Sequence, residues 1–208
     1  MSPRVVPGDR RADRILGRRA DRGASLVEVV LAVTVLMLVA GLALPATAAA
    51  IDEGRARQAA AFMAGRLREA KQQAVTRTAA TGLVFDLVAG RWTFRLCVDG
   101  NANGLRRTDL RAGKDICVDG PVDPAAHFPG VTILVDGTIR GPDGDPPSAD
   151  PVRFGASDLA SFSPSGGCTA GTLFLRSTKG AQYAVRVAGV TGRLRVLRYD
   201  APAKTGDR

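Results

Sequence analysis

The stretch Gly23-Ala24-Ser25-Leu26-Val27-Glu28 lies at the border between a basic leader and a long apolar run. Between Glu28 and Asp52 there are 23 residues without a charge. As a helix this segment is about 35 Å long, which is enough to cross a bilayer with some tilt. The Glu28 carboxylate lies just inside the apolar run, where a charge costs roughly 2.5–3.5 kcal/mol on membrane-insertion scales. We therefore interpret Glu28 as a functional residue.

Length and charge limit the number of domains and the kinds of partner that this chain can have. The chain has 208 residues and a formal charge of +9, of which residues 1–23 carry +4. Residues 52–208 correspond to about one domain, so the totals suit a single membrane-anchored domain. The part that follows the apolar run is still basic, which favours polyanions or anionic surfaces as partners.

Residues 1–51 have two interpretations. In the first they form a secretory signal peptide that is cleaved after Ala46-Thr47-Ala48. The apolar run is long for the hydrophobic region of such a signal, and Glu28 would interrupt its beginning. In the second interpretation the apolar helix is retained as an anchor and cleavage occurs before it.

The second interpretation is supported by a resemblance. The stretch Gly23–Glu28 resembles the type III signal of type IV prepilins and type II secretion pseudopilins. The resemblance implies that prepilin peptidase cuts between Gly23 and Ala24 and methylates the new N-terminus. Glu28 then becomes the fifth mature residue, and Pro45 occupies a position where this family commonly has proline. Ala24 differs from the phenylalanine that is usual at the first mature position.

The physical chemistry of Glu28 agrees with this resemblance. In a filament of packed apolar helices a buried carboxylate needs a positively charged partner. The free amine of Ala24 in a neighbouring subunit is an available cation. Such a pair would set the axial register of the subunits, as buried polar groups do in coiled coils. The sequence thus predicts that Glu28 is required for assembly.

The rest of the chain predicts an α+β, pilin-like fold: a long N-terminal helix, half transmembrane and half amphipathic, packed on an antiparallel β-sheet domain. Apolar residues recur near helical spacing after Asp52, and short β-like runs follow Gly82. The expected strands are 83–88, 91–98, 116–118, 131–135, 152–154, 173–176, 183–187 and 193–196. The expected segments are a leader (1–23), a transmembrane and filament-core helix (24–51), an amphipathic helix (52–80), a β domain (81–200) and a flexible tail (201–208).

Four C-terminal motifs narrow the resemblance to the GspH/FimT branch of minor pilins. They are Phe162–Gly166, Gly171–Leu173, Tyr183–Val187 and Thr191–Arg195. This branch implies an inner-membrane protein with a periplasmic β domain that joins other pilin or pseudopilin subunits in a filament.

Residues 181–199 predict a β-hairpin that turns at Gly189–Gly192. A loop of two or four residues places Ala188 opposite Arg193 and Arg186 opposite Arg195. Arg186, Arg193 and Arg195 then share one face of the hairpin. Like charges directly opposite each other are destabilising, and arginine forks suit phosphate oxygens.

On the other face of this hairpin, Val187 lies opposite Leu194 and Val185 lies opposite Val196, so we expect that face to point to the core. The run Gly192-Arg193-Leu194-Arg195 matches a Gly-Arg-x-Arg motif that in FimT-like pilins is associated with DNA binding during transformation. The resemblance therefore implies binding of double-stranded DNA, and a solvated strand face is the alternative.

Two further features of the sequence bear on its chemistry. Cys97 and Cys117 flank a turn-rich loop, and the periplasm permits a disulfide between them, with two buried thiols as the alternative. Asp99–Gly104 resembles half of a calcium loop, but position twelve is Leu110 instead of a bidentate Glu. We expect no metal site, no cofactor and no enzymatic activity.

Two other functions remain open at this point. One is the minor pseudopilin H of a type II secretion system, a structural tip subunit without a DNA role. The other is a periplasmic binding domain that signal peptidase I releases from the membrane.

Overall fold

The computed structural model describes residues 25–142 and 144–199, in two compact units that span Met1–Pro45 and Ala46–Arg208. Gly23, Ala24, the leader (1–23) and the tail (201–208) lie outside the described residues. The elements are α1 (Leu26–Arg77), β1 (Thr81–Val88), β2 (Arg91–Val98), α2 (Arg107–Arg111), β3 (Ile116–Cys117), α3 (Pro124–His127), β4 (Val131–Thr132), β5 (Val152–Arg153), a 3-10 turn (Gly155–Ser157), β6 (Leu159–Phe162), β7 (Gly171–Ser177), β8 (Gln182–Ala188) and β9 (Arg193–Tyr199).

In the first unit, α1 carries Glu28 in its first turn and is apolar from there to Pro45. Large apolar side chains of this segment, such as Leu31 and Leu38, are exposed. The helix is long and apolar enough to cross a membrane. A membrane anchor is compatible with this composition and this exposure.

In the second unit, α1 buries one narrow stripe of small side chains. The stripe residues recur every three or four positions, as one face of a helix requires. The fully buried members are Ala56, Ala59, Ala60, Met63, Ala64, Leu67, Ala70 and Ala74. Because most of them are alanines, the helix backbone comes close to the strands that it covers.

The end of α1 is set by one residue with a left-handed backbone. Thr78 has φ 52°, a region that β-branched residues rarely adopt. The N–H of Ala79 donates to the carbonyl of Ala74, and the N–H of Thr78 donates to that of Val75, both at 3.3 Å. These two bonds form a Schellman motif, which satisfies the last carbonyls of the helix and directs the chain into β1.

The first sheet has the strand order β3-β2-β1-β6. β1 and β2 are joined by the two residues Ala89 and Gly90, which have φ 49° and 76°. Two positive φ angles make a type I′ turn, whose twist matches that of the flanking strands. Glycine at the second position adopts this conformation without strain.

The second sheet has the order β4-β7-β8-β9, and β5 also pairs with β7. All of its pairings are antiparallel. β9 pairs with β8 along its whole length and forms the edge of the sheet among the described strands.

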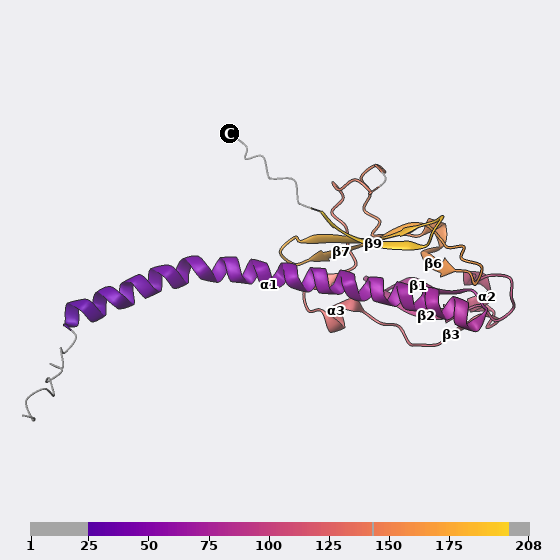
Figure 1. Cartoon of the computed structure of the whole chain (residues 1–208), viewed down its shortest axis with the longest axis horizontal. Helices are drawn as coiled ribbons and strands as arrows, with labels where there is room; N and C mark the ends of the chain where they lie inside the picture. Colours follow the sequence, from indigo (N-terminus) through magenta and orange to yellow (C-terminus); the bar gives the residue numbers. More distant parts are fainter. Residues whose placement is uncertain (1–24, 143, 200–208) are drawn as a thin grey trace, which may run out of the picture. The chain divides into compact units, whose positions relative to one another are not determined.

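One hydrophobic core joins the part of α1 in the second unit to both sheets, and Figure 1 shows this part of the helix running along the strands. Leu83 and Phe94 enter this core from the first sheet, and Leu173 and Val185 enter it from the second. The ring of Phe85 also stacks on that of Phe154, with centroids 5.8 Å apart, and so connects the two sheets directly. The predicted α+β class, with a long N-terminal helix packed on antiparallel sheets, is confirmed.

The strand pattern differs from the sequence prediction at two places. β6 was not predicted, because Leu159–Phe162 is a short run whose extended form depends on pairing with β1. The run expected at 131–135 is a strand only over Val131–Thr132, although Ile133 and Val135 after it are buried.

Leu67→Ala tests the core that joins helix and sheets. Leu67 is fully buried, so the substitution leaves a cavity and should lower the free energy of unfolding by about 2–5 kcal/mol. Thermal unfolding of the full chain in detergent micelles measures the effect. Val75→Ala is the control: this side chain is exposed on the same helix, and its change should stay within about 0.5 kcal/mol. Equal effects would contradict the packing.

Candidate nucleic-acid interface

The hairpin of β8 and β9 has the register expected from the sequence. Arg186 lies opposite Arg195, and Ala188 lies opposite Arg193. The turn closes with a 2.8 Å hydrogen bond from the N–H of Gly192 to the carbonyl of Ala188. The hairpin therefore brings the three arginines predicted for DNA binding onto one face of the second sheet.

The turn of this hairpin is fixed to α1 and to the segment before β7. Lys71 of α1 donates from Nζ to the carbonyls of Thr191 and Gly192, both at 3.2 Å. The free thiol of Cys168 lies within hydrogen-bond distance of two carbonyls, those of Ala188 (3.3 Å) and Gly189 (3.2 Å), and its one S–H group is shared between them. Neither contact was predicted, since Lys71 lies 121 positions from Gly192 and no local pattern links them.

The inner face of the hairpin departs from the prediction at one residue. Val185 and Val187 are fully buried, but Val196 is 39% exposed. Val196 lies on the edge strand, where Ala50 and Gly54 of α1 line a groove beside it. The prediction that Val196 points into the core is wrong, because the small residues on α1 do not cover it.

The outer face carries a row of side chains that crosses four strands. Cα pairing places Arg153 of β5 opposite Thr172 of β7, Thr172 opposite Arg186, and Arg186 opposite Arg195. Neighbouring strands are about 4.8 Å apart, so the row spans roughly 14 Å. We name it the arginine row. Arg153 was missed by the sequence analysis, because its place beside the hairpin depends on the pairing of β5 with β7.

The charges on this face differ in how far they are compensated. Arg193 and Arg195 are exposed, and neither forms an ion pair within residues 25–142 and 144–199. Arg186 donates to the hydroxyl of Thr172 at 3.2 Å. Arg176 is also on β7 and faces outward, but it pairs with Asp136 at 3.2 Å. The excess positive charge is therefore concentrated on the turn half of the hairpin.

The two cysteines singled out from the sequence lie opposite each other on β2 and β3. Cys97 and Cys117 are joined by a disulfide. The bond closes the base of the loop that connects the two strands and contains α2.

Two carboxylates of that loop accept hydrogen bonds from backbone N–H groups of the same loop. Asp99 and Asp115 are both buried. Asp99 accepts from the N–H groups of Asn101 (3.0 Å) and Gly104 (2.7 Å), and Asp115 accepts from those of Gly100 (3.2 Å) and Arg106 (3.0 Å). In the part of the chain that the structure describes, no group of three His, Cys, Asp or Glu residues is arranged to hold a metal ion.

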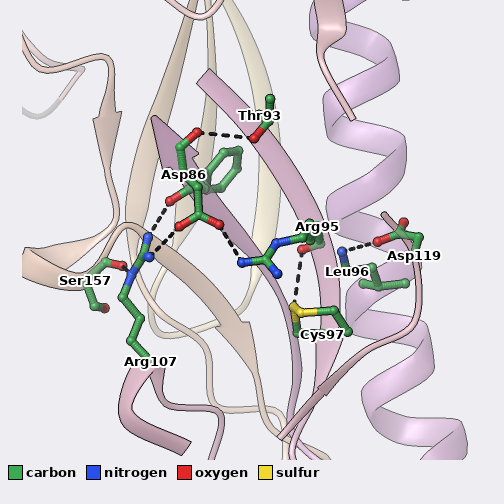
Figure 2. Close-up of polar contacts among 10 residues, drawn as sticks. Asp86, Thr93, Arg95, Leu96, Cys97, Arg107, Asp119 and Ser157 are labelled. Carbon is green, nitrogen blue, oxygen red and sulfur yellow. Dashed lines mark hydrogen bonds and ion pairs between the residues drawn. A yellow bond between two sulfur atoms is a disulfide. The ribbon is translucent and has the colours of Figure 1, made fainter. Parts of the chain in front are cut away.

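The same loop is held to the first sheet by Asp86, shown in Figure 2 between two guanidinium groups. Asp86 of β1 accepts from Arg107 of α2 at 2.6 Å and from Arg95 of β2 at 2.7 Å. Arg107 also donates to the carbonyls of Phe85 and Ser157. Burial raises the pKa of Asp86, but the hydrogen bonds and charges of Arg107 and Arg95 outweigh it and lower this pKa below its usual value.

No family model matches this chain, and no curated protein matches it. One solved structure is similar: the minor pseudopilin EpsH from the type 2 secretion system of Vibrio cholerae. It is 15% identical with a TM-score of 0.39, and the alignment covers 69% of this chain and 97% of that one.

Asp86→Asn tests the ion pairs in Figure 2. The pKa of Asp86 is lower in the folded than in the unfolded chain, so its stabilisation is present above about pH 4 and is lost as the pH falls through the folded value. We expect the variant to lose roughly 1–3 kcal/mol at neutral pH and to show a weaker loss of stability in acid.

Unfolding measured from neutral pH down to about pH 3 checks this expectation. Asp145→Asn is the matched control, because Asp145 is an exposed carboxylate without an ion pair among residues 25–142 and 144–199, and changes at such positions have little effect on stability. If the stability of Asp86→Asn falls with decreasing pH in the same way as that of the unmodified chain, Asp86 does not provide the pH-dependent stabilisation.

Proposed function

We propose that this chain is a minor pilin or pseudopilin subunit. In this proposal prepilin peptidase cleaves after Gly23, the apolar part of α1 anchors the protein in the bacterial inner membrane, and the β domain lies in the periplasm. The observation that carries the proposal is the carboxylate of Glu28 in the first turn of α1, which is the only charged group of the helix before Asp52. A type IV pilus or a related secretion filament is the assembly that the subunit would join.

The energetic cost of Glu28 supports this proposal. A charge in a membrane segment raises the free energy of insertion. A helix that served only as an anchor would therefore insert more favourably without Glu28. The cost is offset when a neighbouring subunit provides a cation, and the methylated amine of Ala24 is such a group after cleavage. Because the pair forms only in one axial arrangement, it would select the register of the filament.

A second activity, binding of double-stranded DNA, is supported by the basic face of the hairpin. Arg193 and Arg195 are exposed without ion pairs among the described residues, and Arg195 lies opposite another arginine. A phosphate backbone would relieve this repulsion, and guanidinium forks fit phosphate oxygens. Binding of this kind is independent of sequence and weakens as salt rises. The proposed biological use is DNA capture during natural transformation.

Two other functions give different outcomes in the same experiments. A minor pseudopilin H of a type II secretion system would share the processing and the assembly but would not bind DNA. A periplasmic domain released by signal peptidase I would have a mature N-terminus near Ala49 and would not be retained in the membrane.

Mass mapping of the mature N-terminus and a Glu28→Ala variant test the filament proposal. We expect a methylated N-terminus at Ala24 in the unmodified protein. The variant should still insert into the membrane, since removal of a charge favours insertion, but should be absent from isolated filaments. Membrane fractionation and immunoblotting of sheared filaments measure both properties.

Thr34→Ala is the control for this experiment, because Thr34 is a neutral residue on the same helix that bonds only to the carbonyl of Val30 in the described structure. A mature chain that begins near Ala49, or filaments with normal amounts of the Glu28→Ala variant, would overturn the proposal.

Arg193→Gln combined with Arg195→Gln tests DNA binding. The loss of two phosphate contacts should weaken binding to duplex DNA at low salt by roughly tenfold to a hundredfold. Fluorescence anisotropy with the full chain in detergent micelles measures the affinity. The control combines Arg77→Gln with Arg111→Gln, which removes the same charge from exposed positions outside the second sheet. Equal losses in both double variants would reject a specific interface.

A further inference from the structure

The arginine row continues beyond the hairpin, onto a strand that is far from it in the sequence. Arg153 of β5 stands two strands from Arg186, with Thr172 of β7 between them. Val152, its neighbour on β5, is in the core between the sheets and α1, so Arg153 is on the outer face. The row therefore begins with Arg153, ends with Arg195 and contains Arg186 between them.

The guanidinium group of Arg153 is held in a defined orientation. Its Cζ lies 4.6 Å from the centre of the Phe174 ring, so the group stacks on an aromatic face. Nε donates to the carbonyl of Asp150 and Nη2 donates to that of Ser148, both at 3.0 Å. Nη1 has no hydrogen-bond partner in the described part of the chain. Nη1 is therefore left to bind a ligand. Because the side chain is already ordered by its contacts in the fold, binding would cost little further side-chain entropy.

The surroundings of Arg153 separate it from the other arginine on this part of the face. Arg176 lies on β7 and is neutralised by Asp136 at 3.2 Å. Arg153 forms no ion pair with any carboxylate in residues 25–142 and 144–199, and its bonds go to neutral carbonyls. Its charge thus adds to that of the hairpin.

We propose that Arg153 contacts phosphate together with Arg186, Arg193 and Arg195, so that one nucleic-acid strand crosses the second sheet from β9 to β5. This inference rests on the proposed DNA binding. It adds Arg153 to the contacting residues and gives the direction in which the nucleic-acid strand crosses the sheet. The row spans roughly 14 Å. Along the axis of a duplex the phosphates of one strand rise about 3.4 Å each, so a duplex whose axis follows the row places about four phosphates of that strand over it. Three of the four arginines lie in the row, and Arg193 lies two residues before Arg195 on β9.

The salt dependence of binding tests this proposal, because the slope of log affinity against log salt counts the phosphates neutralised. Four contacts give a slope of about −3.6 with duplex DNA, and the loss of one contact reduces its magnitude by about 0.9. We expect this reduction for Arg153→Gln, measured between about 50 and 200 mM salt with the full chain in micelles and a duplex of mixed sequence.

Two further variants separate a phosphate contact from a structural role. Arg153→Lys keeps the charge but loses the fork that binds the two carbonyls, so its slope should stay near that of the unmodified chain. Arg176→Gln, on the same face but paired with Asp136, should also leave the slope unchanged. Thermal unfolding of each variant reports whether the loop before β5 is disturbed.

The outcomes distinguish this inference from the proposal on which it depends. If Arg153→Gln keeps the full slope while the Arg193 and Arg195 variant reduces it, DNA binds the hairpin alone and the extended row is overturned. If Arg153→Lys reduces the slope as much as Arg153→Gln does, Arg153 acts through the loop and the phosphate contact is overturned. If no variant changes the slope, DNA binding itself is rejected.

Discussion

The packing of the alanine stripe of α1 against both sheets is the constraint on which the rest of the β domain depends. In the described residues the two sheets share no strand pairing, and their main connection is the core that the helix completes. Because alanines line the stripe, the helix backbone lies close to the strands, and a larger side chain there would displace both sheets. The relation between the sheets is thus set by side-chain size on the helix, with the stacked pair Phe85 and Phe154 as a direct contact.

The helix also positions the proposed interface. Lys71, on the turn of α1 after Leu67, binds two carbonyls of the β8–β9 turn, and the Cys168 thiol shares its S–H group between two more. These contacts hold the turn, so Arg193 and Arg195 leave it at a fixed place. On the first sheet, the ion pairs of Asp86 and the Cys97–Cys117 disulfide hold the loop that contains α2.

Local patterns predicted the fold class and much of the site. The hairpin register followed from the alternation on two adjacent strands joined by a short turn, and the observed pairs agree with it. The same reasoning was wrong for Val196, since alternation gives the side of a strand and not what covers it. β6 was missed because Leu159–Phe162 is extended through its pairing with β1, whose paired residues lie 75 to 81 positions earlier in the chain.

The sequence by itself determined the apolar helix with its one acid, the succession of one long helix and an antiparallel β domain, and the arginines of the hairpin. These features are written in composition, periodicity and neighbouring residues. Only the tertiary structure decided that Lys71 anchors the turn and that Arg153 joins the row. Both depend on which distant segments pack together. Which distant segments pack together depends on the shape and burial of the whole core. It cannot be predicted from a single strand or helix.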